Sequence, residues 1–418
     1  MADFFDLIVV GEGEEVMPEL LQLYRRAKKE GMDKPAFLRA AAQLGGVYVP
    51  SLYEITYGET GAIEAIRPLE GAPAVVNKRV VRDFDKAYYP DYFLVPNTEI
   101  VFDRAMVELF RGCRRGCRLS SSDYPHLETL CESLVDYFEP KHVSLALPSL
   151  RADSFNLDLV QNIQKVRKSG LTFAPEAGTQ RLRDVINKNL REEDLLEACK
   201  VAFQAGYNGV KLYFMMGLPT ETDEDLLGIS QIVRHVIATF REHGKNKARG
   251  VRINVGISIF VPKAQTPFQW LGQITGEEAR RKKQLLMDSL KIKNVTYSIH
   301  DYRTSFLEAV LARGDRRLSA VLKKAWEKGS RLDGWDELFS FDAWMQAFEE
   351  CGIDPAFYAN RSLEKDEILP WDHIFSGVRK DYLYGELEQA RQGIATPDCK
   401  AGCRNCGSLC LTGGKCDV

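Results

Sequence analysis

Residues 210–225 have the sequence VKLYFMMGLPTETDED, which joins a strand, a turn and the start of a helix. The short apolar run Val210 to Met215 predicts a buried strand. Pro219 makes the turn rigid, and either Thr220 or Thr222 can cap the following helix, whose first turn is acidic. The stretch therefore predicts one βα unit, with its turn at the carboxyl end of the strand.

Similar units recur on both sides of this stretch. The other expected strands are Ile100–Leu109, Val143–Leu147, Leu171–Ala174 and Ile253–Val261, and the expected helices are Phe155–Lys168, Glu192–Gln204, Asp223–His243 and Gly276–Leu290. Alternating strands and helices with short connections predict an α/β fold with a parallel sheet, doubly wound or curved into a full or partial barrel. In either arrangement the ligand site lies at the carboxyl ends of the strands.

Changes of composition divide the chain into five segments. They are a Rossmann-like βα unit at 1–45, a linker or small irregular module at 46–98, the α/β core at 99–297, a mostly helical, Trp-rich extension at 298–395, and a Cys-rich tail at 396–418. In the first segment, strand Asp6–Val10 leads through the turn Gly11–Glu15 into helix Val16–Lys29.

The composition is that of a globular protein with a sizeable core. The chain has 418 residues, of which 45% are hydrophobic and 28% charged. Its net charge of −3 gives no overall attraction to nucleic acid or anionic membranes. Because neither a secretory signal nor an apolar run of about 18 residues is present, we expect a cytoplasmic protein without a membrane partner. Cytosolic thiols stay reduced, so the ten cysteines favour metal binding over disulfides.

Two groups of cysteines have spacings that suit a metal. Cys113 and Cys117 lie in a Gly-containing loop, RGCRRGCR at 111–118, that follows a predicted strand. The tail has the pattern Cys399-x3-Cys403-x2-Cys406-x3-Cys410, which suits either an iron–sulfur cluster or zinc. Disorder of the tail and unligated thiols in the loop are the structural alternatives. Three further cysteines, Cys131, Cys199 and Cys351, fall on helical patterns and are expected to be buried.

Two more motifs stand at predicted strand ends. The first, FAPEAGTQRL at 173–182 followed by Lys188, places Glu176 after a strand and Gly178 before a helix. A helix start favours an anion and a lysine supplies a point charge, although a capped helix with a surface lysine explains the same residues. The second, FVPKAQTP at 260–267, must be extended before each proline.

Together with the GLPTET turn, these motifs resemble the radical S-adenosylmethionine (SAM) superfamily, in particular its methylthiotransferase-like branch. The resemblance implies that Glu176 touches SAM, that Lys188 neutralises the SAM carboxylate, and that Gly178, Gly217 and Pro219 place backbone around the cofactor. It also implies a 4Fe–4S cluster held by three cysteines spaced Cys-x3-Cys-x2-Cys, whose open iron binds SAM.

The chain departs from this pattern at the third cysteine. Cys113 and Cys117 match, but Ser120 occupies the third position, and a hydroxyl is a poor substitute for a thiolate on iron. The next SAM-binding loop of the family, here Ser121, Ser122 and Asp123, adjoins the cysteine loop directly. We therefore expect that one αβ unit is missing between Arg118 and Leu119.

The ends of the chain extend the resemblance to uncharacterised radical SAM proteins that carry a cobalamin (B12)-binding domain. The turn Gly11–Glu15 is similar to the end of that domain, and the motifs at 303–309 and 369–373 are similar to the helical extension. The earlier strands of the cobalamin domain are absent, so we expect an N-terminally truncated member that does not bind cobalamin.

By this resemblance the chain is a radical SAM enzyme that cleaves SAM reductively to a 5′-deoxyadenosyl radical acting on an unknown substrate. A flavodoxin or ferredoxin would supply the electron, and no catalytic side chain is assigned. The alternative is an inactive relative that acts as a binding or scaffold protein, with a partner subunit and a metal only in the tail. A third interpretation is a sequence artefact that has lost internal and N-terminal segments.

Overall fold

The structure is a computed structural model of the chain. It describes residues 2–69, 71–83, 86, 88, 105–106, 127–138, 145–146, 171–397 and 402–412.

The helices and strands alternate from Leu171 to Ile299, as the sequence pattern predicts, and mostly helices follow. The strands are β1 (Ile8–Val9), β2 (Val47–Tyr48), β3 (Tyr53–Tyr57), β4 (Ile63–Pro68), β5 (Val76–Asn77), β6 (Ala105–Met106), β7 (Leu145–Ala146), β8 (Leu171–Glu176), β9 (Gly209–Met216), β10 (Arg252–Ile259), β11 (Val295–Ile299) and β12 (Ile374–Phe375). The helices are α1 (Gly13–Glu30), α2 (Lys34–Ala41), α3 (Leu127–Phe138), α5 (Gln180–Val185), α6 (Glu192–Gln204), α7 (Asp223–His243), α8 (Gly276–Ser289), α9 (Tyr302–Arg313), α10 (Leu318–Glu327), α11 (Phe341–Glu350), α12 (Pro355–Ala359) and α13 (Lys380–Arg391).

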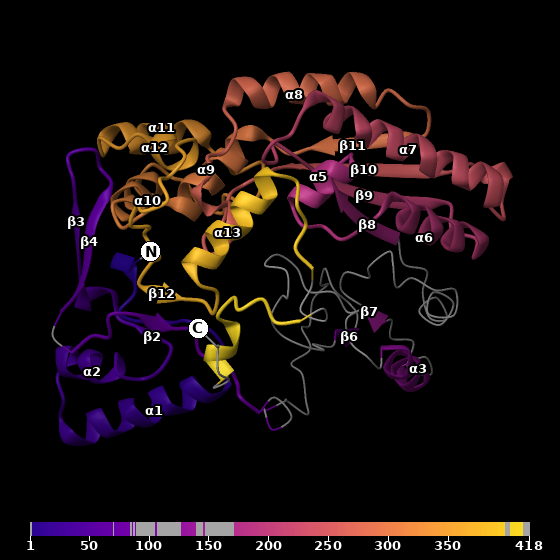
Figure 1. Cartoon of the computed structure of the whole chain (residues 1–418). Coiled ribbons are helices and arrows are strands. Elements are labelled where there is room, and N and C mark those ends of the chain that lie inside the picture. Colours follow the sequence, from indigo (N-terminus) through magenta and orange to yellow (C-terminus); the bar gives the residue numbers. More distant parts are fainter. Residues whose placement is uncertain are drawn as a thin grey trace.

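The centre of the α/β core is a four-stranded parallel sheet in the order β11-β10-β9-β8. Helices α6, α7 and α8 run along one face of it (Figure 1), and the strands point alternate apolar side chains into this helical layer. In β9 these are Leu212, Phe214 and Met216, all buried. The parallel sheet confirms the predicted α/β fold, and β6 and β7 form a second parallel pair.

The sheet extends slightly beyond the predicted core. Strand β11 ends at Ile299, whereas the core was expected to end at 297, before a helical extension. Its short VTYSI sequence lies at the sheet edge with mostly exposed side chains, so its apolar content is too low to predict a strand. Helix α9 then begins the extension at Tyr302.

The N-terminal module packs against the C-terminal extension rather than standing apart from it (Figure 1). Its expected strand, turn and helix are present, with β1 paired antiparallel to β2. Strand β5 pairs in parallel with β12 of the extension. The Arg316 guanidinium adds hydrogen bonds to the Tyr53 and Pro50 carbonyls, at 3.0 and 2.8 Å. Segments from opposite ends of the chain therefore form one body.

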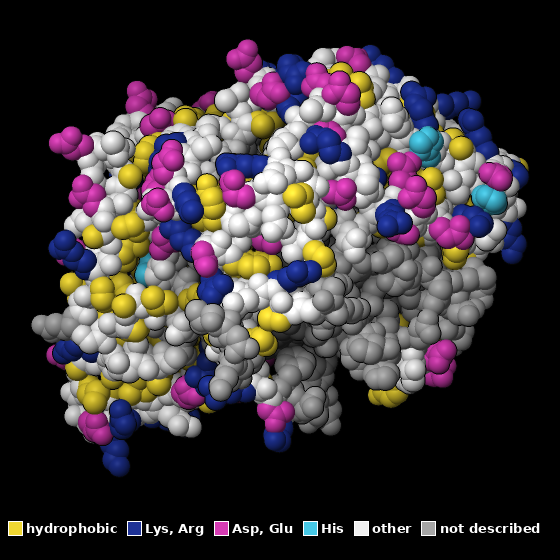
Figure 2. Space-filling model, viewed as in Figure 1, with side chains coloured by type: hydrophobic (Ala, Val, Ile, Leu, Met, Phe, Trp, Pro, Cys, Tyr) yellow, Lys and Arg dark blue, Asp and Glu magenta, His cyan; other side chains and the backbone are white. Residues whose placement is uncertain are grey.

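The surface carries both signs of charge without a dominant field. Figure 2 shows Lys and Arg interspersed with Asp and Glu over the described part of the visible face. No helix among the described residues has the length and apolar character required to cross a membrane.

Candidate functional site

The first motif places an ion pair at the carboxyl end of β8. Glu176 is the last residue of the strand, and its carboxylate lies 3.3 Å from the Lys188 ammonium. The Glu176 side chain is 6% exposed and that of Lys188 is 30% exposed, so the ammonium still reaches solvent. Glu176 has φ 69°, a left-handed conformation that a glutamate adopts only when its surroundings enforce it. The predicted pairing of these residues at a strand end is therefore present.

Gly178 has a packing role that the sequence pattern does not reveal. A Cβ atom at this position would lie 2.2 Å from the Asp225 carbonyl oxygen and 2.5 Å from the Ile229 amide nitrogen. Only a glycine lets the loop after β8 approach helix α7 so closely. This contact accounts for Gly178 without a ligand, and its expected place beside SAM stays a prediction.

Asp225 links the FAPEAGTQRL motif at 173–182 to the GLPTET turn at 217–222. Its carboxylate accepts hydrogen bonds from the Thr179 hydroxyl, the Arg181 guanidinium and the Thr222 amide. Thr222 caps α7, so it fills the helix-capping role that the sequence left open between Thr220 and Thr222. Burial raises the pKa of the Asp225 carboxyl, but these hydrogen bonds outweigh burial and hold that pKa below its usual value. The carboxylate therefore stays charged and fixes the two strand ends relative to each other.

A buried ion pair supports the turn after β9. Gly217 has φ 80°, and its amide donates to the Glu221 carboxylate at 2.8 Å. The same carboxylate lies 2.7 Å from the Lys282 ammonium of α8, and the two side chains are 1% and 5% exposed. Burial raises the pKa of the Glu221 carboxyl more than Lys282 and the Gly217 amide lower it. The ion pair between Glu221 and Lys282 thus anchors the turn containing Gly217 and Pro219 to helix α8.

The two turns adjoin. The Arg181 guanidinium donates to the Thr220 carbonyl at 2.8 Å, and Glu176 is in register with Phe214. Thr220 itself has φ 61°, so it is part of the turn and not of the helix cap. Four of the predicted residues, Glu176, Lys188, Gly217 and Pro219, therefore share the carboxyl edge of β8 and β9.

The FVPKAQTP motif at 260–267 connects this edge to the C-terminal extension. The Gln265 amide donates to the Ile374 carbonyl at 2.9 Å, and its oxygen accepts from the Ser376 hydroxyl at 3.2 Å. The Trp371 indole donates to the Gln269 side chain at 2.7 Å. These contacts give the motif a structural role in fixing the extension against the strand ends.

Most of the predicted metal ligands and the serine loop cannot be placed. Cys113, Cys117, Ser121, Ser122, Asp123 and Cys399 lie outside the described residues. In the tail, Cys403 and Cys410 are exposed and Cys406 is half-buried, and the Asn405 amide donates to the Cys403 sulfur at 3.4 Å. Within the described parts of the chain, no three His, Cys, Asp or Glu side chains gather closely enough to hold a metal ion. The tail and loop metal sites remain predictions.

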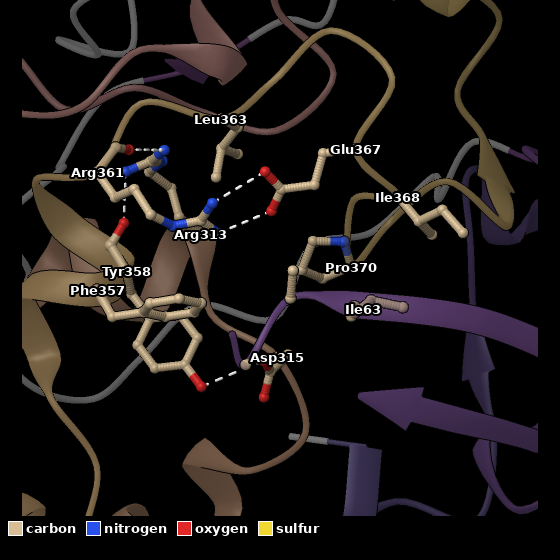
Figure 3. Close-up of a pocket in the computed structure, with 12 residues that line it drawn as sticks. Ile63, Arg313, Asp315, Phe357, Tyr358, Arg361, Leu363, Glu367, Ile368 and Pro370 are labelled. Carbon is tan, nitrogen blue, oxygen red and sulfur yellow. Dashed lines mark hydrogen bonds and ion pairs between the residues drawn. The ribbon is translucent and has the colours of Figure 1, made fainter. Parts of the chain in front are cut away.

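A small cavity lies away from these strand ends, between the β3–β4 hairpin and the α9–α12 region (Figure 3). The Arg361 guanidinium pairs with Glu367 at 2.7 and 2.9 Å, and the Tyr358 hydroxyl donates to Asp315 at 3.2 Å. Its volume of about 20 Å³ holds about one water molecule. The cavity is therefore too small for a nucleoside cofactor, and its polar groups act in packing.

Sequence reasoning missed three residues that build the site: Arg181, Asp225 and Lys282. Asp225 belongs to a visible Thr-x-x-Asp capping pattern, which was interpreted only as a helix start. Lys282 carries no local signal, because its partner Glu221 lies on a different element.

Comparisons with known proteins give the family context. Residues 1–50 match a model described as the N-terminal part of radical SAM proteins, and residues 119–232 match the model of the radical SAM superfamily. Over 374 residues the chain is 26% identical to an uncharacterized protein of Methanocaldococcus jannaschii, an alignment that covers 84% of this chain and 76% of that protein. Two parts of the chain are thus similar to radical SAM domains. The superfamily match begins directly after the loop with Cys113 and Cys117, so these cysteines lie in neither matched segment.

Proposed function

We propose that the chain is a radical SAM enzyme that binds SAM at the carboxyl ends of β8 and β9. The observation that carries the proposal is the Glu176–Lys188 pair beside the Gly217–Pro219 turn, inside the segment similar to the superfamily core.

The residues at this edge fit the charges of SAM. The partly exposed Lys188 ammonium can bind the carboxylate of the methionine moiety, and the Glu176 carboxylate offers acceptor oxygens to hydroxyl or ammonium groups. Gly217 sets the left-handed backbone of the turn, and the space in front of its Cα is filled by the Ile274 side chain, which a Cβ would meet at 2.8 Å. Lys188 and Glu176 would orient the cofactor, while Asp225 and Lys282 keep their turns in place.

When bound, a reduced 4Fe–4S cluster would supply the electron for the reductive cleavage of SAM to methionine and a 5′-deoxyadenosyl radical. Cys113 and Cys117 would hold this cluster. Because Ser120 stands where the third cysteine is expected, the proposal requires a third ligand from elsewhere. A flavodoxin or ferredoxin would deliver the electron. The two superfamily matches favour this function over a scaffold role in which only the tail cysteines bind metal.

Binding can be tested separately from chemistry. Equilibrium dialysis of labelled SAM against the full chain should show binding that Lys188→Met weakens by about tenfold or more, the loss of one charge-assisted contact worth about 1.5–3 kcal/mol. The matched control is Lys200→Met, because Lys200 pairs with the exposed Glu197 on α6. Equal SAM binding by wild type and Lys188→Met would contradict the proposed site.

Chemistry is tested by oxygen-free reconstitution with iron, sulfide and a reductant, followed by chromatography for 5′-deoxyadenosine. We expect product from the wild type, none from Cys113→Ala, and wild-type levels from Cys351→Ser, whose sulfur lies at the end of α11. Reconstituted protein that holds iron but forms no 5′-deoxyadenosine would leave only the scaffold function.

A further inference from the structure

The sheet face opposite the helices carries polar side chains that core packing does not explain. Thr172, Lys211, Asn254 and Thr296 stand side by side in register on β8, β9, β10 and β11. All four are exposed, whereas the residues before and after Lys211 and Asn254 on the two central strands are buried under the helices. Strands of parallel sheets covered on both faces are apolar throughout. This face is therefore built for contact with water or a polar ligand.

In this row, Lys211 places its ammonium towards the carboxyl ends of the strands. The Lys211 ammonium lies 4.8 Å from the centroid of the Tyr213 ring. Tyr213 stands two residues nearer the carboxyl end, and its ring packs against Gly256, where a Cβ atom would meet it at 2.7 Å. Lys211 thus leans along the strand towards Glu176 and Gly217. From Tyr213 to the end of β9 at Met216 the distance is roughly 10 Å at 3.3 Å per residue.

Three of the four strands bring only positive charge to this face, and the single carboxylate on the fourth, Glu176 at the end of β8, pairs with Lys188. Strands β9, β10 and β11 contain no Asp or Glu, and they contribute the exposed Lys211 and Arg252. In the described part of the chain no carboxylate forms an ion pair with Lys211. The Thr296 hydroxyl donates to the side-chain oxygen of Asn254, which leaves the amide NH2 of Asn254 as a donor. An ammonium, an amide and the Thr172 hydroxyl therefore form a row of donors.

We infer that this row binds an oxyanion, a carboxylate or phosphate group of the enzyme's substrate. Lys211 and Asn254 hold the anionic group, and the rest of the substrate extends along Tyr213 to the strand ends where SAM binds. The inference rests on the proposed function for the identity of the ligand as substrate. The donor row itself can be tested without a cluster or SAM.

The test uses the full chain and two probes, inorganic phosphate and acetate, titrated by calorimetry at low ionic strength. Wild type should bind phosphate, acetate or both, which distinguishes the two sources of the anion. Lys211→Met should lower the affinity at least about tenfold, equal to 1.4 kcal/mol, and Lys211→Arg should restore most of it. Lys247→Met is the control, since Lys247 lies beyond the end of α7, is exposed and donates to the Glu242 backbone carbonyl.

Two results would overturn the inference: wild type that binds neither probe, or Lys211→Met that binds them as wild type does. Dialysis of SAM on the same variants separates this outcome from the proposed function. Lys211→Met should keep wild-type SAM affinity, because Lys211 lies far from the strand ends. A wild type that binds SAM but neither probe would reject the donor row alone, and a wild type that binds the probes but not SAM would reject the SAM site alone.

Discussion

Replacing Lys282 by methionine should expose how strongly the turn after β9 depends on its buried ion pair. The substitution keeps the apolar stem of the side chain and removes the ammonium, which lies 2.7 Å from the Glu221 carboxylate. That carboxylate is 1% exposed, and its second oxygen already lacks a hydrogen-bond partner. Removing one member of a buried pair costs about 3–5 kcal/mol, so we expect a loss of about 3 kcal/mol in the free energy of unfolding.

The double variant Glu221→Gln/Lys282→Met isolates the interaction. A neutral amide at 221 can still accept from Gly217, and no buried charge is left unpaired. Its loss relative to wild type should therefore be smaller than that of Lys282→Met alone. Lys283→Met, on the exposed side of the same helix, should change stability by less than about 0.5 kcal/mol.

Urea unfolding gives the overall loss, and hydrogen exchange on peptides from β9 and α8 shows where it occurs. Because burial raises the pKa of Glu221, its carboxyl takes up a proton more readily in the folded state, and losing the ammonium raises that pKa further. The variant should therefore be closer to wild type at pH 5 than at pH 8. A loss under about 1 kcal/mol, or one equal at both pH values, would refute the reasoning.

Three further outcomes follow from the packing and charges. Gly178→Ala should destabilise the core by about 1–3 kcal/mol, because its Cβ would meet the Asp225 carbonyl at 2.2 Å. The control is Gly385→Ala, in open space on α13, which should stabilise the protein by up to about 1 kcal/mol. Similar shifts of the melting temperature for both variants would contradict the packing role of Gly178. His373 packs against both Tyr48 and Tyr53, and burial, with a smaller contribution from Arg316, lowers its pKa to about 4, below its ordinary 6.5. Stability should therefore fall by up to about 3 kcal/mol as the pH drops from about 6.5 to 4, and His373→Phe should flatten that profile in calorimetry. Asp225→Asn should lower the free energy of unfolding by about 1–3 kcal/mol at neutral pH. The difference from wild type should shrink in acid, where the wild-type carboxyl is itself protonated. A difference in stability that stays constant down to acid unfolding would exclude a charged Asp225.

Local patterns predicted the backbone of the core well from residue 171 onward, whereas the expected helix Phe155–Lys168 and most of the expected strands Ile100–Leu109 and Val143–Leu147 lie outside the described residues. Helices α6 and α7 begin and end where expected, because Arg191 and Thr222 stand before acidic first turns and the apolar residues follow helical spacing. The ends of β8 and β9 carry Glu176 and Gly217 for the same reason: a strand terminates where glycine, proline and charge interrupt the apolar run.

What the sequence could not reveal are contacts between elements. Nothing local links Glu221 to Lys282, or Arg181 to Asp225, since each pair joins residues 44 or more positions apart. The two roles of glycine were also indistinguishable: Gly217 needs a left-handed backbone, whereas Gly178 needs room for α7. Metal binding by the cysteine loop and by the tail cysteines stays a prediction that rests on the spacing of the cysteines alone.

The pairing of β5 with β12 has a practical consequence for dissecting the chain. The Val76 and Lys78 amides donate to the carbonyls of His373 and Phe375, each at 2.8 Å. Residues almost 300 positions apart thus complete each other's hydrogen bonding, and deleting either end would leave donors or acceptors of the other facing solvent or a void. Expression of the N-terminal part through β5 alone, or of a chain ending after α8, should yield fragments that aggregate. Co-expressing the two parts as separate polypeptides should let them associate through the pairing of β5 with β12.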